Sequence, residues 1–288
     1  MLHAETPLTL CDLAANPAAH NGKVIDVTAF VSHGFEDFTL FDPRCPSREL
    51  RVWVEYGGTF ASGTIYCCGV TDERSRKEPL TVDGTPTTII EDESLRHFDE
   101  LVQQEPDSVV HATLRGRFFS GELQHWPGGT LWSGYGHFGL FALFVIEQVV
   151  AADPHDHPGL DYRSEGDAPD FAGDVHFSKS IGGTSYETAM ALQRQAESGA
   201  RAWSFADPLR VATESLADCV AGRPGLRLTV VTRDLGRVVY DGTLPGKNNR
   251  YRVVVSRPYW LSFFAESPHR VAWIAAYVYE SGADDDEL

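Results

Sequence analysis

Residues 50–56, with the sequence LRVWVEY, carry the clearest secondary-structure signal in the chain. The segment alternates between two faces, and one face carries only apolar or aromatic side chains: Leu50, Val52, Val54 and Tyr56. A period of two residues is typical of a β-strand that turns one face toward a core. We therefore predict a strand over 50–56 and extend the fold prediction outward from it.

Strand-like segments lie on both sides of this strand. Residues 23–32 are rich in valine and lead through the polar turn SHGFED into strand-like residues 38–41. Residues 92–106 predict a helix, because apolar residues recur there at helical spacing until a proline. Further strands are predicted over 64–70, 109–119 and 138–150. If one of the first three strands is counted as split or as a hairpin, a single helix lies between the third and fourth strands of a five-stranded barrel, which is the order of the OB-fold.

The second half of the chain predicts an α+β domain. Capping patterns at Thr184 and at Asp207-Pro208 predict two helices. They are followed by a predicted meander of about five strands, over 226–232, 237–243, 250–256, 259–265 and 271–280.

The predicted fold class is mainly β with α+β character. Residues 152–174 are crowded with Asp, Gly and Pro and predict a linker. The predicted organisation is an OB-like five-stranded barrel over 1–151, this linker over 152–174, and a two-helix plus β-meander domain over 175–288.

The charge of the chain disfavours anionic partners. Its 288 residues include 24 basic and 41 acidic side chains, for a formal net charge of −17, and the first 150 residues contribute −11 of it. Such a surface repels phosphate backbones and anionic lipids, so we expect neither a nucleic-acid nor a membrane partner. Basic partners remain open.

The apolar runs of the sequence are too short to predict a membrane-spanning helix. The longest run, 138–146, is less than half of the ~20 residues that a spanning helix needs. We recognise no leader peptide, and the compartment stays open between the cytoplasm and, if a leader has been removed, the periplasm or the exterior.

Two interpretations of the cysteines remain open. The five residues form no C-x-x-C pair, which disfavours a zinc ribbon or a thioredoxin-type site. They are Cys11, Cys45, Cys67, Cys68 and Cys219. Buried free thiols are one interpretation. A disulfide between Cys11 and Cys45, which flank the first predicted strands, is the other and suits an exported protein.

Catalytic motifs are missing from the sequence. It has no G-x-S-x-G elbow, no P-loop, no G-x-G-x-x-G after a predicted strand (Gly134-Tyr135-Gly136 precedes one) and no H-E-x-x-H pair, so we predict no cofactor and lean against an enzyme. One alternative is a metal-dependent hydrolase. Its ligands would come from His125, His137, His155 and His157, because a His-x-His pair on an extended segment directs both rings to one side.

The strongest binding signal is the loop over 120–136, SGELQHWPGGTLWSGYG, which interleaves glycines with aromatic residues. OB-folds bind ligands through the loop between strands four and five and the loop between strands one and two. The candidate contact residues from these two loops and the position that follows are Phe35, Trp126, Trp132, Tyr135 and His137. The alternative is that the tryptophans fold back and close the barrel mouth.

A basic segment breaks the acidic pattern of the second half. Residues 223–257 contain eight basic and two acidic side chains, and Arg250 and Arg252 share one face of a predicted strand. With Arg227, they form a candidate basic docking face for an acidic partner or for the first domain. Alternating arginines on a solvent-exposed face are the other interpretation.

Several short motifs resemble a family of uncharacterised bacterial proteins. They are Leu10-Cys11-Asp12-Leu13, Asn16-Pro17, Asn21-Gly22-Lys23-Val24, Phe35-Glu36, Cys45-Pro46 and Gly134-Tyr135-Gly136-His137. The resemblance covers about residues 8–150, and it implies an OB-like domain of a kind that is often exported. It implies no catalytic residue.

The leading functional hypothesis is a two-domain, non-enzymatic binding protein. Its aromatic loop would contact a protein or another macromolecule, and inhibition or neutralisation of a secreted toxin or enzyme is one form of this role. The metal-dependent hydrolase is the second hypothesis. A single-stranded nucleic-acid binder is the third, and the charge of the first domain disfavours it.

Overall fold

The protein is described by a computed structural model, which places residues 6–34, 36–45, 49–64, 73–104, 108–163, 179–220, 225, 227–243 and 250–281. The chain divides into two compact units, residues 1–155 and 156–288, which are described separately below. Phe35, the strand predicted over 64–70 apart from its first residue, and 164–174 of the predicted linker lie outside the described residues.

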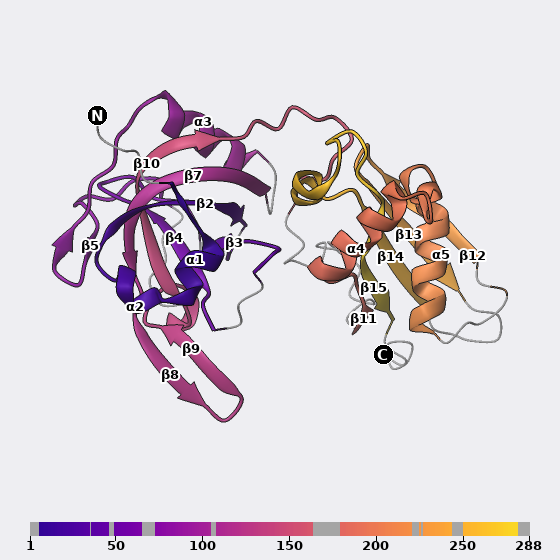
Figure 1. Cartoon of the computed structure of the whole chain (residues 1–288), viewed down its shortest axis with the longest axis horizontal. Helices are drawn as coiled ribbons and strands as arrows, with labels where there is room; N and C mark the ends of the chain where they lie inside the picture. Colours follow the sequence, from indigo (N-terminus) through magenta and orange to yellow (C-terminus); the bar gives the residue numbers. More distant parts are fainter. Residues whose placement is uncertain are drawn as a thin grey trace. The chain divides into compact units, whose positions relative to one another are not determined.

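The first unit is built on a closed barrel of five strands (Figure 1). The strands are β2 (Val24–His33), β3 (Phe38–Phe41), β4 (Val52–Tyr56), β7 (Ser108–Phe119) and β10 (Ala142–Ala152). They follow the order β2-β3-β4-β10-β7, and the pairing of β7 with β2 closes the barrel. Only β4 and β10 are parallel within this ring. This arrangement confirms the predicted OB-like barrel.

The helix α3 (Glu93–Gln103) lies between β4 and β7 in sequence, as the prediction requires. Asp92 caps its first turn by accepting a 3.0 Å hydrogen bond from the backbone N–H of Leu95. Its buried residues pack into the barrel core and are those predicted from helical spacing: Leu95, Phe98, Leu101 and Val102.

Strand β4 is covered on both faces, whereas its sequence predicted a strand with a single buried face. Trp53 is 1% exposed and Glu55 is 7% exposed, although both lie on the face opposite Val52 and Val54. Segments far from β4 in sequence provide this cover, and they also form the candidate site described below.

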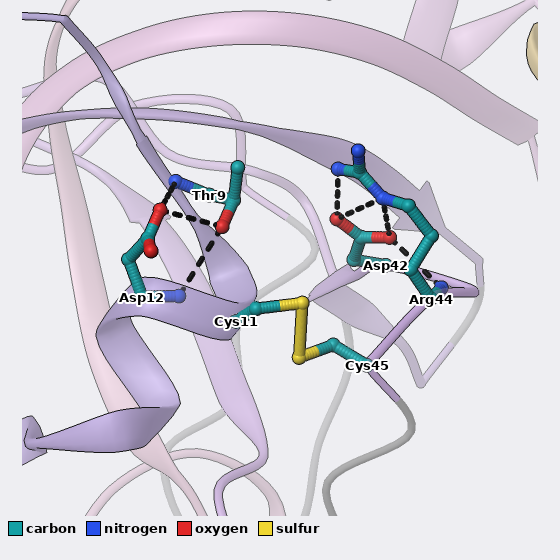
Figure 2. The surroundings of a disulfide bond; sticks show 6 residues. All are labelled: Thr9, Cys11, Asp12, Asp42, Arg44 and Cys45. Atoms are coloured by element: carbon teal, nitrogen blue, oxygen red, sulfur yellow. Dashed lines mark hydrogen bonds and ion pairs between the residues drawn. A yellow bond between two sulfur atoms is a disulfide. The ribbon is translucent and has the colours of Figure 1, made fainter.

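A disulfide joins Cys11 to Cys45, with the two Cα atoms 5.4 Å apart (Figure 2). Cys11 lies on the short helix α1 (Leu10–Ala15), which the capping box of Thr9 and Asp12 opens, while Cys45 follows β3. The disulfide interpretation is therefore confirmed for this pair. Cys219 is a free, exposed thiol, in contrast to the buried free thiols considered above, and Cys67 and Cys68 lie outside the described ranges.

The remaining small elements of the first unit include a second short helix, two hairpins and one 3₁₀ turn. Strand β1 (Leu8–Thr9) pairs with β2, and α2 (Pro17–His20) follows α1. The other elements are β5 (Thr81–Val82), β6 (Thr85–Pro86), β8 (Glu122–Trp126), β9 (Gly129–Ser133) and η1 (His137–Gly139). Most of the predicted loop over 120–136 is thus a β-hairpin, which extends away from the barrel strands in Figure 1.

The second unit combines a five-stranded antiparallel sheet with two main helices. The sheet order is β11-β15-β14-β13-β12, from β11 (Lys179–Gly182), β12 (Arg227–Arg233), β13 (Arg237–Thr243), β14 (Arg250–Ser256) and β15 (Ile274–Glu280). The helices are α4 (Tyr186–Glu197) and α5 (Pro208–Cys219), with η2 (Ala202–Phe205) between them. The caps are Ser185, one residue after the predicted position, and Asp207 as predicted.

One predicted strand of the meander was wrong. Residues 259–265 form mainly the 3₁₀ helix η3 (Tyr259–Phe264), and the fifth strand of the sheet is instead β11. The backbone here makes local i→i+3 hydrogen bonds: the N–H of Leu261 donates to the carbonyl of Pro258 at 3.0 Å, and that of Ala265 donates to the carbonyl of Ser262 at 3.3 Å. The apolar composition of this segment alone suggested a strand.

Among the described residues, no helix has the length and hydropathy required to cross a membrane.

Candidate binding site

The β8–β9 hairpin has two faces with different surroundings. Cross-strand pairing sets Leu123 opposite Trp132 and Trp126 opposite Gly129. Because side chains alternate along a strand, Trp126 and Trp132 lie on opposite faces of the hairpin. All five residues of β8 are exposed, and Trp126 is 53% exposed. The two tryptophans that the sequence grouped together therefore have different environments.

Trp132 anchors the hairpin to the barrel. Its side chain is partly buried and packs against the barrel core, and its backbone N–H donates a 2.8 Å hydrogen bond to the carbonyl of Glu49. The hydroxyl of Thr130 donates a second bond, also 2.8 Å, to the carboxylate of Glu49. Trp132 therefore folds back onto the barrel, as one of the two interpretations of the sequence expected. Trp126 remains exposed and available for contact.

Tyr135 ties the segment after the hairpin to the turn between β5 and β6. Its hydroxyl donates a 2.5 Å hydrogen bond to Oδ2 of Asp83, and its backbone pairs with Phe141. Burial raises the pKa of the Tyr135 hydroxyl well above its ordinary range, and the neighbouring Asp83 carboxylate adds to the shift. The hydroxyl therefore stays protonated and remains a donor at physiological pH.

Asp83 occupies the two-residue turn of the β5–β6 hairpin. Its φ angle is +49°, and that of Gly84 is +75°. Positive φ at both central residues is the requirement of a type I′ turn, for which Asp-Gly is a preferred pair. The sequence prediction missed this residue, although the Asp83-Gly84 pair was a signal that could have revealed the hairpin.

Phe138 is held in an unusual and exposed conformation. Its φ angle is +56° and it is 64% exposed, and it lies between Gly136 and Gly139, which both have positive φ. A bulky residue in the left-handed region is strained, and such strain persists where the surrounding structure imposes it. The His137 ring packs edge-on against Phe138 with 4.1 Å between centroids.

Gly136 lets this segment pack directly on β4. A Cβ atom at Gly136 would lie 2.8 Å from the Cβ and Cγ atoms of Trp53, so only glycine fits the contact. This close approach explains why Trp53 is buried, although it lies on the face of β4 for which the sequence pattern did not predict burial.

Two adjoining cavities flank the Tyr135–Asp83 hydrogen bond. The first, here called the outer cavity, has a volume of about 650 Å³ and lies beside the hairpin. Its lining includes Asp83, Glu122, Gln124, Trp126, Tyr135 and Phe138. Among the described residues that line it, there are two carboxylates and no Lys, Arg or His.

The second, here called the inner cavity, has a volume of about 740 Å³ and lies over β4. It shares Asp83, Tyr135 and Phe138 with the outer cavity, so the two form one divided groove, here called the binding groove. Its apolar lining includes Trp53, Ala61, Leu80, Val82 and Leu143.

Asp83 lies at the border of the inner cavity with the outer one, and the other two charged residues that line it bond to each other. Arg76 contacts the Glu55 carboxylate at 2.6 Å and also donates to the carbonyls of Tyr56 and Phe60. The Trp53 indole N–H donates to the other Glu55 oxygen at 3.4 Å. Burial raises the pKa of Glu55, and the Arg76 charge opposes that shift. Because these two charges compensate each other, the part of the cavity away from Asp83 suits an uncharged group.

The histidines considered as metal ligands do not form a cluster. His155 bonds to Gln104 and donates to the carbonyl of Val109 at 2.9 Å, and burial lowers its pKa. His157 belongs to the second unit, where it lies near Asp156 and packs edge-on against His269. His125 lies on exposed β8. Within the described ranges, no group of three or more His, Cys, Asp or Glu residues could hold a metal ion.

The predicted basic docking face is partly neutralised. Arg252 is buried and makes two hydrogen bonds of 2.6 and 2.7 Å to Asp241, the residue opposite it on β13. Arg250 contacts the same carboxylate at 3.5 Å, while Arg227 is exposed at the start of β12. Two of the three arginines therefore share a carboxylate within their own sheet.

In comparisons with known proteins, no family model, curated protein or solved structure matches the chain. The resemblance over residues 8–150 thus rests on its short motifs alone.

Proposed function

We propose that this is a non-enzymatic binding protein, whose β8–β9 hairpin and binding groove contact a protein partner. The observation that carries the proposal is the exposure of Trp126 on a hairpin whose opposite face is fixed to the barrel by Trp132. Tryptophan is enriched among the residues that contribute most to binding at protein interfaces. An exposed aromatic surface beside a concave site is a typical interaction surface.

The polar groups of the groove support binding rather than catalysis. The buried Glu55 carboxylate is engaged by Arg76 and Trp53, and the Tyr135 hydroxyl is engaged by Asp83. Both groups are therefore engaged by partners within the protein.

The disulfide supports a location outside the reducing cytosol. Disulfides such as Cys11–Cys45 persist mainly in oxidising compartments, where a secreted toxin or enzyme would be available as the partner. Inhibition or neutralisation of such a protein is the form of function that fits both the groove and the disulfide.

Site-specific photocrosslinking in cells that produce the protein tests this proposal. A photoreactive phenylalanine analogue would replace Trp126, and a control chain would carry it at Leu235, which is 74% exposed in the second unit. We expect one defined protein to crosslink at position 126 and not at position 235. Crosslinking of the same proteins from both positions, or of none from position 126, would contradict the proposal.

A further inference from the structure

We infer that the binding groove recognises an extended peptide segment in which a lysine or arginine lies two positions from an apolar residue. The cation would occupy the outer cavity and the apolar side chain the inner cavity. The inference rests on the proposed function and names the chemistry of the partner.

The outer cavity offers two kinds of group that attract a cation. Asp83 and Glu122 contribute carboxylates, while Trp126 and Phe138 contribute aromatic rings that are more than half exposed. Lysine and arginine bind aromatic faces through the ring quadrupole and bind carboxylates through charge-assisted hydrogen bonds. Among the described residues, Tyr135 is the only side chain bonded to Asp83, and it uses Oδ2, which leaves Oδ1 for a ligand.

The inner cavity offers a complementary apolar site. Its lining includes Trp53, Leu80, Val82 and Leu143, and the charges of Glu55 and Arg76 compensate each other in an ion pair. Its volume of about 740 Å³ falls within the range of ordinary ligand sites. Away from the border at Asp83, a charged group would lose its hydration beside charges that are already paired, whereas an apolar group would gain from burial.

The ridge between the two cavities sets the spacing of the ligand. Tyr135, Asp83 and Phe138 line both cavities, so the cavities adjoin along one surface. In an extended peptide, residues i and i+2 direct their side chains to the same side and lie roughly 7 Å apart. Two such side chains can enter the two cavities while the residue between them faces solvent.

The charge of the whole first unit favours a basic peptide over a neutral sugar. Aromatic rings with the amides of Asn21 and Gln124 could also contact an oligosaccharide. A net charge of −11 over the first 150 residues steers cations toward the barrel and gives no advantage to an uncharged ligand. The acidic groove also repels phosphorylated ligands.

Fluorescence anisotropy on the full chain tests this inference. The probe is a fluorescein-labelled ten-residue peptide with the repeat Lys-Ser-Leu-Ser, and two comparison peptides replace every lysine by glutamate or every leucine by serine. We expect the probe to bind and both replacements to weaken binding by about tenfold or more, since each removes one of the two anchors.

A matched pair of double variants separates the groove from general attraction. Asp83→Asn with Glu122→Gln removes two charges in the groove, and asparagine tolerates the positive φ of Asp83. Glu91→Gln with Glu100→Gln removes two exposed charges of the same unit that do not line either cavity. We expect about a tenfold loss of affinity in the first pair and less than twofold in the second.

Three outcomes would overturn the inference. Equal weakening by both double variants would mean that binding is non-specific. Stronger binding of a neutral glucose hexasaccharide, lost in Trp126→Ala, would assign the groove to carbohydrate. No binding of the probe together with specific crosslinking at position 126 would reject the basic peptide while leaving the proposed function standing. Failure of the crosslink itself would reject the proposed function.

Discussion

The hydroxyl of Tyr135 donates a 2.5 Å hydrogen bond to Asp83 across 52 positions of the chain. This bond joins the segment after the β8–β9 hairpin to the tip of the β5–β6 hairpin, and both residues line both cavities. Tyr135 and Asp83 therefore form the ridge that divides the groove. Loss of the hydrogen bond between them should affect ligand binding more than folding.

Tyr135→Phe tests the role of this ridge. The variant keeps the ring and removes the donor, so we expect the free energy of unfolding to fall by only about 1 kcal/mol. Affinity for the Lys-Ser-Leu-Ser probe should fall by about three- to tenfold, because Asp83 loses the bond that positions it. Anisotropy and urea denaturation measure the two effects. Tyr162→Phe, which removes a hydroxyl in the second unit, is the control. Unchanged affinity in Tyr135→Phe would contradict the assigned role.

Gly136→Ala should disrupt the contact between this segment and β4. The new Cβ would lie 2.8 Å from Trp53, and Gly136 has a φ angle of +66°, which is costly for alanine. We expect a loss of about 2 kcal/mol or more in the free energy of unfolding. Gly128→Ala, at a glycine with no heavy atom within 4 Å of the added Cβ, should cost less than about 0.5 kcal/mol. Equal stability of the two variants in urea denaturation would show that the Gly136 contact is absent in solution.

The Cys11–Cys45 disulfide should stabilise the first unit. The bond closes a loop across 34 positions, so we expect Cys11→Ala with Cys45→Ala to lower the free energy of unfolding by about 2–4 kcal/mol. Cys219→Ala, which removes an exposed free thiol, should leave stability nearly unchanged. Scanning calorimetry with and without a reducing agent measures this effect. A reductant that does not shift the unfolding of the wild-type chain would contradict the expectation.

Acid should destabilise the first unit through His33. This residue is buried on β2 within hydrogen-bonding distance of Thr64 and Gln103, and burial lowers its pKa below the ordinary value of 6.5, with the Arg74 charge adding to the shift. The unfolded state therefore binds a proton more readily than the folded state below about pH 6.5. The stability is fully present above that pH and is lost as the pH falls through the lowered pKa.

Urea denaturation between about pH 7 and pH 5 measures this dependence. We expect the free energy of unfolding to fall over this range in the wild type and to fall less steeply in His33→Gln, which keeps a polar group but does not titrate. The slope is compared rather than the absolute stability, because the substitution also changes packing. The same slope in both proteins would exclude His33 as the source.

The barrel could be predicted because its elements carry their own periodic signals. The apolar positions of β2, β7 and β10 and the helical spacing of α3 depend on each segment alone, and their order along the chain identified the OB-like arrangement. The β8–β9 hairpin could not be predicted in this way. Every residue of β8 is exposed, so no alternation of buried and exposed positions is written into its sequence.

The candidate site could be predicted only in part. The aromatic segment and Trp126 were found from composition, but the roles of Trp126 and Trp132 were separated only by the hairpin register. Asp83 and the inner cavity depend on contacts between segments that are distant in sequence, such as Tyr135 with Asp83 and Arg76 with Glu55. Local patterns contain no information on such pairs.

Hydrogen–deuterium exchange on the full chain, with and without a saturating concentration of the Lys-Ser-Leu-Ser probe, tests the central claim most directly. Binding in the groove predicts slower exchange in β8, in residues 134–140 and in the β5–β6 hairpin, with no change in β12 or β13 of the second unit. Protection confined to the second unit, or no protection anywhere at saturation, would contradict the account.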